Sequence, residues 1–223
     1  WSVLSGAGDA GRGRIAMEAV DRRLVRRNAG LVQLLDPPFN TSAMNPGYIR
    51  GYVPGVRENG GQYTHAAIWA AMAYARQADA VRAWELLDLI NPVKHTLSET
   101  AVSVYKTEPY VVAADVYAVA PHTGRGGWTW YTGSAGWLYR LILESLLGLS
   151  RIGDVLHIAP CLPAHWTSFE LQYRYRETLY NIEVRPLRQG ETVSAAWVDG
   201  IQQAGSTILL QDDGKPHAVT ITV

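Results

Sequence analysis

The first part of the chain places apolar residues at helical spacing and separates them with polar turns. Residues 9–28 predict a helix with Asp9 as its N-cap. Residues 62–77 are rich in Ala and apolar on almost every side, which is typical of a buried helix. Residues 79–91 predict an amphipathic helix, so these last two segments should form a helix hairpin.

Two further segments in this part are mostly apolar. Residues 108–118 begin with a Pro in a first-turn position and predict a helix, and residues 132–149 predict a long one with Thr132 as its cap. Residues 36–62 contain several Pro and Gly but also large apolar side chains, so they predict a long ordered loop. Long loops inside compact domains are usually functional.

From Arg151 onward the pattern changes to strands. Apolar and polar side chains alternate along residues 169–176, and YRYRETLYNIEVRP predicts a strand pair. The segments TVSAAWVDG and STILLQDDGKPHAVTITV, within residues 192–223, predict hairpins with Asp-Gly turns. The expected fold is therefore mainly α with a C-terminal β domain, and the expected boundary divides residues 1–150 from residues 151–223. Helices that alternate between buried and amphipathic suggest an α/α toroid, of which residues 1–150 would form part.

Composition excludes several classes of protein. Lys+Arg and Asp+Glu both number 20, so the formal net charge of +0 gives no attraction to nucleic acid or to an anionic membrane. No stretch is long and apolar enough to span a bilayer, no signal peptide is visible, and the single Cys161 excludes an internal disulfide. The His residues are scattered and predict no metal site.

The aromatic residues are skewed toward types with a polar group. Trp numbers 8 and Tyr 12, but Phe only 2. Trp and Tyr surfaces suit sugar rings, which combine apolar C–H faces with hydroxyl rims. A Trp-rich core is the alternative interpretation for most of these residues.

The sequence GAGDAG, from Gly6 to Gly11, matches the G-x-G-x-x-G pattern of dinucleotide-binding folds. No β-α-β pattern follows it. A turn between two helices explains these glycines better.

The sequence GYVPGVRENGGQYTH places polar side chains around the start of the buried helix. Arg57, Glu58, Asn59, Gln62 and His65 cluster there, although such groups rarely enter an apolar helix without partners. A helix N-terminus offers free N–H groups and a favourable dipole to an anion. A hydrogen-bonded core histidine remains the alternative interpretation of His65.

The sequence GRGGWTWYTGSAGW, from Gly124 to Trp137, has a similar design. Thr132, Gly133 and Ser134 stand at the start of a second apolar helix, where Gly lets backbone amides reach a ligand. We expect this helix start and His65 to converge on one anion.

Three segments carry a resemblance to a known family. GYIRGYVPGVRENGGQYTHAA, EPYVVAADVY and GRGGWTWYTGSAGW resemble the C-terminal half of glycoside hydrolase family 94, the inverting disaccharide phosphorylases. The similarity extends from Trp1 to the segment YRYRETLYNIEVRP. The variant at the start, WSVLSGAGDAGRGRIAMEAVDRRLV, is most similar to bacterial cyclic β-1,2-glucan synthases that carry such a domain.

The resemblance implies a fold and a reaction. The fold would be part of an (α/α)6 barrel followed by a small antiparallel β domain. The reaction would be inverting phosphorolysis of a β-glucosidic bond, with inorganic phosphate as co-substrate and no cofactor. The resemblance also implies that phosphate is held by His65, Thr132 and Gly133, and the sugar by Glu58, with Arg57, Gln62 and Trp130 as further candidates.

The chain departs from the family pattern in two places. The general acid of the family is an Asp in a Trp-Asn-Asp type motif upstream of GYIRGY, and these residues contain no such motif. Where several disaccharide phosphorylases have a Gln, this chain reads Ala113-Ala114-Asp115, which leaves acceptor specificity open. The expected partners are therefore a β-glucan or oligosaccharide, phosphate and the upstream part of the same polypeptide.

Three interpretations remain open. The chain is a fragment of a glucan synthase phosphorylase domain, a phosphorylase chain completed by another subunit, or a carbohydrate-binding or structural module without the chemistry. A partial barrel would also expose apolar helix faces, so self-association is expected. The expected location is cytoplasmic, as the C-terminal part of an inner-membrane protein.

Overall fold

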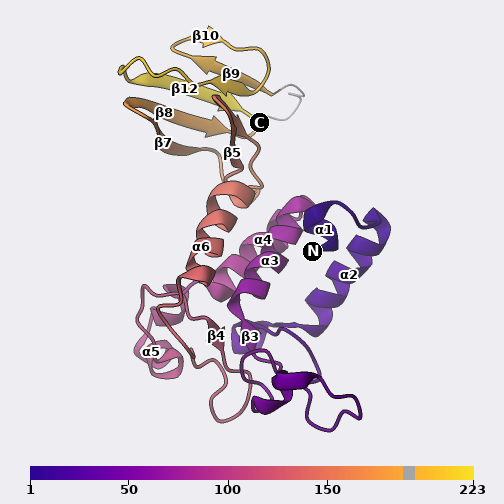
Figure 1. Ribbon diagram of the computed structural model, residues 1–223. Coiled ribbons are helices and arrows are strands. Elements are labelled where there is room, and N and C mark those ends of the chain that lie inside the picture. The colour runs from indigo at the N-terminus through magenta and orange to yellow at the C-terminus, as the bar shows by residue number, and fades with distance from the viewer. Residues whose placement is uncertain (188–193) are drawn as a thin grey trace. The chain divides into compact units, whose positions relative to one another are not determined.

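The computed structural model describes residues 1–187 and 194–223. The chain forms two compact units, Trp1–Ile142 and Leu143–Val223. Figure 1 shows mostly helices, with short strands such as β3 and β4, in the first unit and strands in the second. Within the described residues, no helix is long and apolar enough to cross a membrane.

The first unit begins with a short and a longer helix joined by the GAGDAG segment. Helix α1 (Ser2–Ser5) ends at Gly6, whose φ of 71° is the left-handed conformation that glycine adopts easily. The carboxylate of Asp9 then accepts a hydrogen bond from the Arg12 N–H and caps α2 (Ala10–Arg23). The interpretation of these glycines as a helix–turn–helix connection is confirmed.

Helix α2 is shorter than the predicted 9–28. After Arg23 the chain forms β1 (Val25–Arg26), a 3-10 turn (Arg27–Ala29) and β2 (Leu31–Val32), which pairs antiparallel with β1. Val25, Leu31 and Val32 are buried in this strand pair, whereas Arg27 and Asn28 in the turn are exposed.

The predicted hairpin of a buried and an amphipathic helix is confirmed. Helix α3 (Thr64–Arg76) packs along α4 (Ala80–Ile90), and the carboxylate of Asp79 accepts a hydrogen bond from the Arg82 N–H to cap α4. The hydroxyl of Tyr74 donates to the Met17 carbonyl at 2.7 Å and ties α3 to α2. The buried core of the pair includes Ala67, Ile68, Ala71, Tyr74, Ala83, Leu86, Leu87 and Ile90.

The long loop predicted before α3 is present, and the side-chain amide of Asn59 connects two parts of it. It contains a 3-10 helix (Gly47–Gly51) and ends at β3 (Gln62–Tyr63). Asn59 is fully buried: its side chain accepts from the Phe39 N–H and donates to the carbonyls of Phe39 and Tyr52. This amide therefore holds two distant points of the loop together.

The helix predicted over residues 108–118 is wrong. A 3-10 turn (Lys94–Thr96) and α5 (Glu99–Tyr105) come first, and α5 ends at Lys106, whose φ is 54°. A turn at residues 109–110 follows, and the chain then reaches β4 (Asp115–Val116), which pairs antiparallel with β3. This segment therefore forms a turn and a short strand in place of the predicted helix.

Helix α6 (Thr132–Arg140) begins where the sequence predicts, and a π-helix (Leu141–Leu146) continues it. Its N-cap is Tyr131, and Thr132 is the first helical residue, so the prediction of Thr132 as the cap is wrong. The predicted end at residue 149 is also too late, because Leu149 begins a strand.

The second unit contains two sheets. The three-stranded sheet has the order β11-β6-β5 and the five-stranded sheet the order β10-β9-β12-β8-β7. The bounds are β5 (Leu149–Ile152), β6 (Val155–Ile158), β7 (Phe169–Tyr175), β8 (Thr178–Arg185), β9 (Ala195–Val198), β10 (Ile201–Gln202), β11 (Thr207–Leu209) and β12 (His217–Thr222).

The small C-terminal sheet domain is confirmed, with two differences in pairing. The β7–β8 hairpin and the β9–β10 hairpin with its Asp199-Gly200 turn are as predicted. The Asp213-Gly214 turn does not close a hairpin, since β11 pairs with β6 and β12 pairs parallel to β8. Residues 192 and 193, at the start of the segment predicted to form the first of these hairpins, lie outside the described residues.

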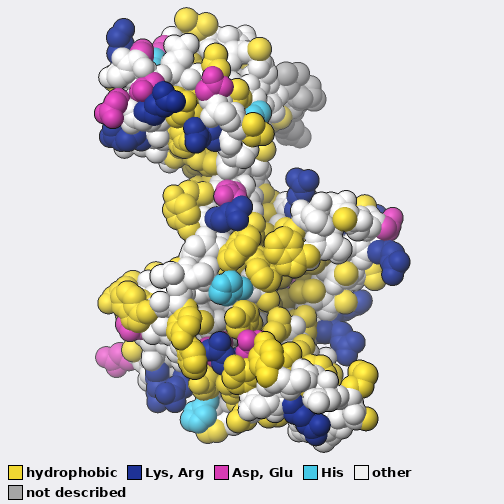
Figure 2. Space-filling view, in the orientation of Figure 1, with side chains coloured by type: hydrophobic (Ala, Val, Ile, Leu, Met, Phe, Trp, Pro, Cys, Tyr) yellow, Lys and Arg dark blue, Asp and Glu magenta, His cyan; other side chains and the backbone are white. Residues whose placement is uncertain are grey.

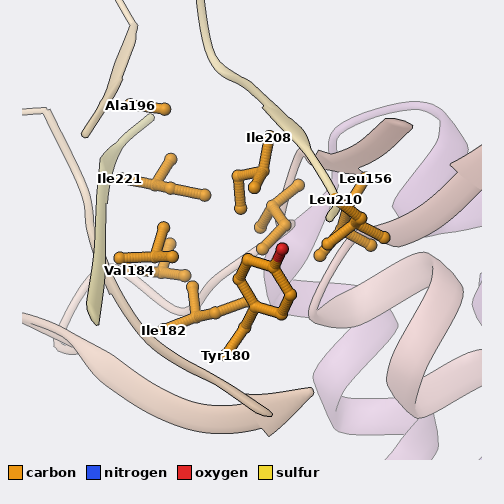
Figure 3. Packing of buried hydrophobic residues seen from close by; sticks show 10 residues of the cluster. Leu156, Tyr180, Ile182, Val184, Ala196, Ile208, Leu210 and Ile221 are labelled. Carbon is orange, nitrogen blue, oxygen red and sulfur yellow. The ribbon is translucent and has the colours of Figure 1, made fainter. Parts of the chain in front are cut away.

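The core of the second unit lies between its strands. Figure 3 shows Tyr180, Ile182 and Val184 of β8 meeting Ile221 of β12 and Ile208 of β11. Every second residue of β8 is buried, as the alternation in the sequence predicts.

Candidate functional site

The histidine singled out in the sequence lies in the first turn of α3. The ring of His65 stacks on Tyr63, with 5.5 Å between the ring centroids, and meets the edge of Trp69 at 6.2 Å. Its Nδ1 is buried and has no hydrogen-bond partner. This unpaired nitrogen argues against the alternative interpretation of His65 as a hydrogen-bonded core histidine.

The structure brings His65 to the start of α6. An ideal Cβ placed on Gly133 would lie 2.8 Å from Nε2 of His65, and α3 packs against α6. Thr132 and Gly133 are themselves exposed. The two helix starts that the sequence predicts to converge thus lie side by side.

Both helix starts leave their first N–H groups without a side-chain cap. The N-caps of α3 and α6 are Tyr63 and Tyr131, and neither makes a capping hydrogen bond, whereas Asp9, Asp79 and Ser98 cap α2, α4 and α5. Uncapped N–H groups and the helix dipole favour an anion. Burial lowers the pKa of His65 below its ordinary 6.5, so its ring is neutral at pH 7 until an anion stabilises the proton.

A second group of polar side chains surrounds Arg57. Its Nε lies 3.5 Å from Oε2 of Glu58, and its Nη1 lies 3.8 Å from Oδ1 of Asp115. The guanidinium also lies over the rings of Trp128, at 4.3 Å from the centroid, and Tyr52, at 5.7 Å. Opposing charges and aromatic faces are therefore concentrated at one place.

Asp115 and Trp128 are members of this group that the sequence prediction missed. The backbone N–H of Trp128 donates to Oδ1 of Asp115 at 3.1 Å, and the Asp115 side chain is 0% exposed. Burial is the main cause that raises the pKa of Asp115 above its ordinary 3.8. The available signal was a carboxylate inside the apolar run EPYVVAADVYA, because charged side chains are rarely buried without a partner.

The remaining predicted sugar contacts are placed differently. Gln62 is buried: its Oε1 accepts from the Val32 N–H and its Nε2 donates to Thr64. Its amide is thus used inside the protein, an arrangement that does not favour a sugar contact. Trp130 is 65% exposed, and its Nε1 donates to Glu108 at 2.9 Å while its ring meets the edge of Tyr110.

Aromatic side chains are abundant on the surface of this unit. Figure 2 shows hydrophobic side chains gathered over one face of the helical unit, with few charged groups among them. The exposed aromatic residues of the unit include Tyr110, Trp128, Trp130 and Tyr131. Residues 1–187 and 194–223 contain no group of three or more His, Cys, Asp or Glu side chains that could hold a metal ion.

Uncapped helix starts beside a histidine can bind an anion, and a cluster of charged and aromatic side chains can bind a sugar. Comparison with known families shows the class of protein. The model of the glycosyl hydrolase 94 superfamily catalytic domain matches residues 1–148, and that of the glycosyl hydrolase family 65 C-terminal domain matches residues 149–193. The chain belongs to the glycosyl hydrolase 94 superfamily, a family of carbohydrate-active enzymes that includes glycoside phosphorylases.

Individual relatives carry related activities. The chain is 50% identical, over 86% of its length, to the cyclic beta-(1,2)-glucan synthase NdvB of Rhizobium meliloti (strain 1021). It is 32% identical over 99% of its length to the N,N'-diacetylchitobiose phosphorylase of Vibrio furnissii, and 27% identical over 99% to the solabiose phosphorylase of Paenibacillus borealis. The chain covers 7%, 27% and 28% of these three proteins, respectively.

Proposed function

We propose that the chain supplies the phosphate-binding and sugar-binding part of a domain that carries out inverting phosphorolysis of β-glucosidic bonds. Inorganic phosphate is the co-substrate and attacks the anomeric carbon, while a carboxylic acid from outside these residues protonates the leaving oxygen. The observation that carries the proposal is the position of His65 directly beside Gly133, at two uncapped helix starts.

Each predicted phosphate contact has a physical role in this proposal. His65 donates a charge-assisted hydrogen bond to phosphate, and Gly133 leaves room for the anion to approach the backbone N–H groups of α6. Thr132 adds a hydroxyl donor at the same helix start. The imidazole, neutral in the free protein, gains a proton when the anion binds.

Sugar binding falls to the cluster around Arg57 and Glu58. Guanidinium and carboxylate groups make paired hydrogen bonds to sugar hydroxyls, while exposed rings such as Trp130 pack on sugar C–H faces. We assign β-1,2-glucan as the substrate, supported by the similarity to the cyclic β-1,2-glucan synthase. The 1,2-beta-oligoglucan phosphorylase of Listeria innocua, 27% identical over 70% of this chain, adds support for the same linkage.

We further propose that residues 1–142 form part of an (α/α)6 barrel, with the rest supplied by the upstream part of the same polypeptide. Support comes from the buried α3 and amphipathic α4, and from exposed apolar side chains such as Ile15 and Val81. The same faces could instead meet a second copy, so self-association stays a prediction, as does a cytoplasmic location.

Saturation kinetics in the intact polypeptide test this function. Phosphorolysis is followed as release of glucose 1-phosphate, with one curve varying phosphate and the other varying β-1,2-glucan. His65→Ala should raise the phosphate KM by about one to two decades, the value of one charge-assisted hydrogen bond. Glu58→Gln should raise the KM for the glucan and leave phosphate saturation unchanged.

The opposite pattern would refute these assignments. A His65→Ala variant with an unchanged phosphate curve would identify His65 as a packing residue. An intact polypeptide that binds β-1,2-glucan but consumes no phosphate would identify the domain as a carbohydrate-binding module.

A further inference from the structure

A buried cluster of charges contains more hydrogen-bonding capacity than the protein itself uses. Within it, Oδ2 of Asp115, Oε2 of Glu58, and both Nε and Nη1 of Arg57 are buried without a hydrogen-bond partner. The ion-pair distances of 3.5 and 3.8 Å are longer than direct hydrogen bonds. Buried polar atoms left unpaired are costly, so a cluster of them marks this place as a candidate functional site.

The charges of the cluster indicate which class of ligand it can bind. Two carboxylates face one guanidinium, so a further anion would be repelled, and the guanidinium disfavours a metal ion. A neutral group that both donates and accepts hydrogen bonds satisfies the Glu58 carboxylate and the guanidinium together. Neighbouring hydroxyls of a glucosyl unit have this property.

The three side chains are not equally accessible. The side chain of Asp115 is 0% exposed, whereas those of Arg57 and Glu58 are 14% and 18% exposed. A ligand therefore reaches Arg57 and Glu58, while Asp115 lies behind them. Asp115 must therefore affect ligand binding through its neighbours.

Asp115 accepts two hydrogen bonds from the segment that carries Trp128. Its Oδ1 accepts the Trp128 N–H, and its backbone carbonyl accepts the Gly127 N–H at 2.8 Å. A Cβ on Gly127 would lie 2.5 Å from both carboxylate oxygens, so the backbone at Gly127 packs directly on this side chain. Asp115 thus fixes the backbone that carries the Trp128 ring, on which the guanidinium of Arg57 rests.

Arg57 needs such support. Its φ of 48° is in the left-handed region, which is strained for a residue with a long side chain. Strained residues persist where the surrounding contacts hold them, and they occur often at ligand sites.

We propose that Asp115 is a positioning residue that fixes the guanidinium of Arg57 on the ring of Trp128 and thereby prepares Arg57 and Glu58 to bind adjacent hydroxyls of a glucosyl unit. This proposal rests on the proposed function for the identity of the sugar. Asp115 itself does not touch the substrate.

The main variant is Asp115→Asn. It keeps the shape of the side chain and an oxygen to accept the Trp128 N–H, but it removes the charge that attracts Arg57. In the intact polypeptide we expect the KM for β-1,2-glucan to rise about tenfold, as loss of a charge-assisted contact implies. The KM for phosphate should stay within about twofold, because His65 and Gly133 belong to the other group of residues.

A double-mutant cycle separates positioning from general damage to the fold. If Asp115 acts through Arg57, then Asp115→Asn added to Arg57→Met should cause no further rise in the glucan KM. Additive losses, or equal losses toward glucan and phosphate, would overturn the proposal in favour of a structural role.

A spectroscopic measurement tests positioning without any sugar. The ¹⁵Nε–Hε resonance of Arg57, assigned with Arg57→Lys, should be resolved in the wild type and broadened or shifted toward free arginine in Asp115→Asn. An unchanged resonance would overturn the proposal even if the proposed function holds. A changed resonance in a protein that acts on no β-glucan would support the positioning role and reject the proposed function instead.

Discussion

The imidazole of His65 lies directly against Gly133 at the start of another helix, so that a methyl group on Gly133 would fall 2.8 Å from Nε2. The two residues are far apart in the sequence, and only the packing of α3 against α6 brings them together. An imidazole beside uncapped helix N–H groups offers donors that suit a small anion.

Gly133→Ala is expected to weaken phosphate binding without unfolding the helix. The added methyl displaces His65 and removes one charge-assisted hydrogen bond, which corresponds to about a 10- to 100-fold loss of affinity. Gly136→Ala is the matched control, because it adds the same methyl to the same helix with nothing within 4 Å. Isothermal titration with phosphate compares the two variants, and equal affinities would contradict the site.

Sulfate binding should be accompanied by proton uptake at His65. Burial lowers the pKa of the free ring below 6.5, and a bound dianion stabilises the protonated ring and raises that pKa. Affinity for sulfate therefore increases as the pH falls toward the free pKa and levels off below it. Sulfate is the probe because it does not itself titrate in this range, and the pH dependence should vanish in His65→Gln.

Gln62→Leu is expected to destabilise the helical unit by about 1–3 kcal/mol, because the buried Val32 N–H loses its acceptor. Sugar binding by the folded fraction should remain unchanged if the amide is only structural. Urea unfolding measures the free energy, and Gln172→Leu, at an exposed amide, is the control. A stable Gln62→Leu protein with weakened sugar binding would show that the sequence-based assignment was right.

The stability of the second unit should depend on the protonation of His217. Its Nδ1 lies 2.6 Å from Asp199 and its Nε2 lies 3.2 Å from Asp213, and the hydrogen bond with Asp199 is the main cause that raises its pKa above 6.5. A raised pKa stabilises the fold fully below pH 6.5, and this contribution is lost as the pH rises through the folded value.

At acid pH, the carboxylates of Asp199 and Asp213 limit the stability of the second unit. The pKa values of Asp199 and Asp213 are lowered from 3.8, so their contribution is present above 3.8 and is lost as the pH falls through the lowered values. The melting temperature of the second unit should therefore be highest between about pH 4 and 6.5. His217→Gln should remove the decline on the alkaline side, and an unchanged profile would contradict the assignment.

Much of the fold could be predicted because the local spacing of apolar residues indicates which side chains are buried. The Ala-rich apolar segment before Asp79 predicts a buried helix, and the alternation from Phe169 to Arg185 predicts a hairpin, because both patterns depend on near neighbours. The glycines and hydrogen-bond donors around His65 and Gly133 also indicated both helix starts correctly. These features require no knowledge of what packs against them.

Other features depended on contacts between distant segments. The stretch before Asp115 forms a turn and leads into the short pairing of Asp115–Val116 with β3, and β12 pairs parallel to β8 although an Asp-Gly turn precedes it. The sequence predicts Gln62 as a sugar-binding residue, but its side-chain amide accepts a hydrogen bond from the Val32 N–H inside the protein. The sequence by itself thus determined the buried α3 and the starts of α2, α4 and α6. The tertiary structure alone decided that Asp115 meets Arg57, because this contact joins segments that are distant in the sequence and no local pattern reports it.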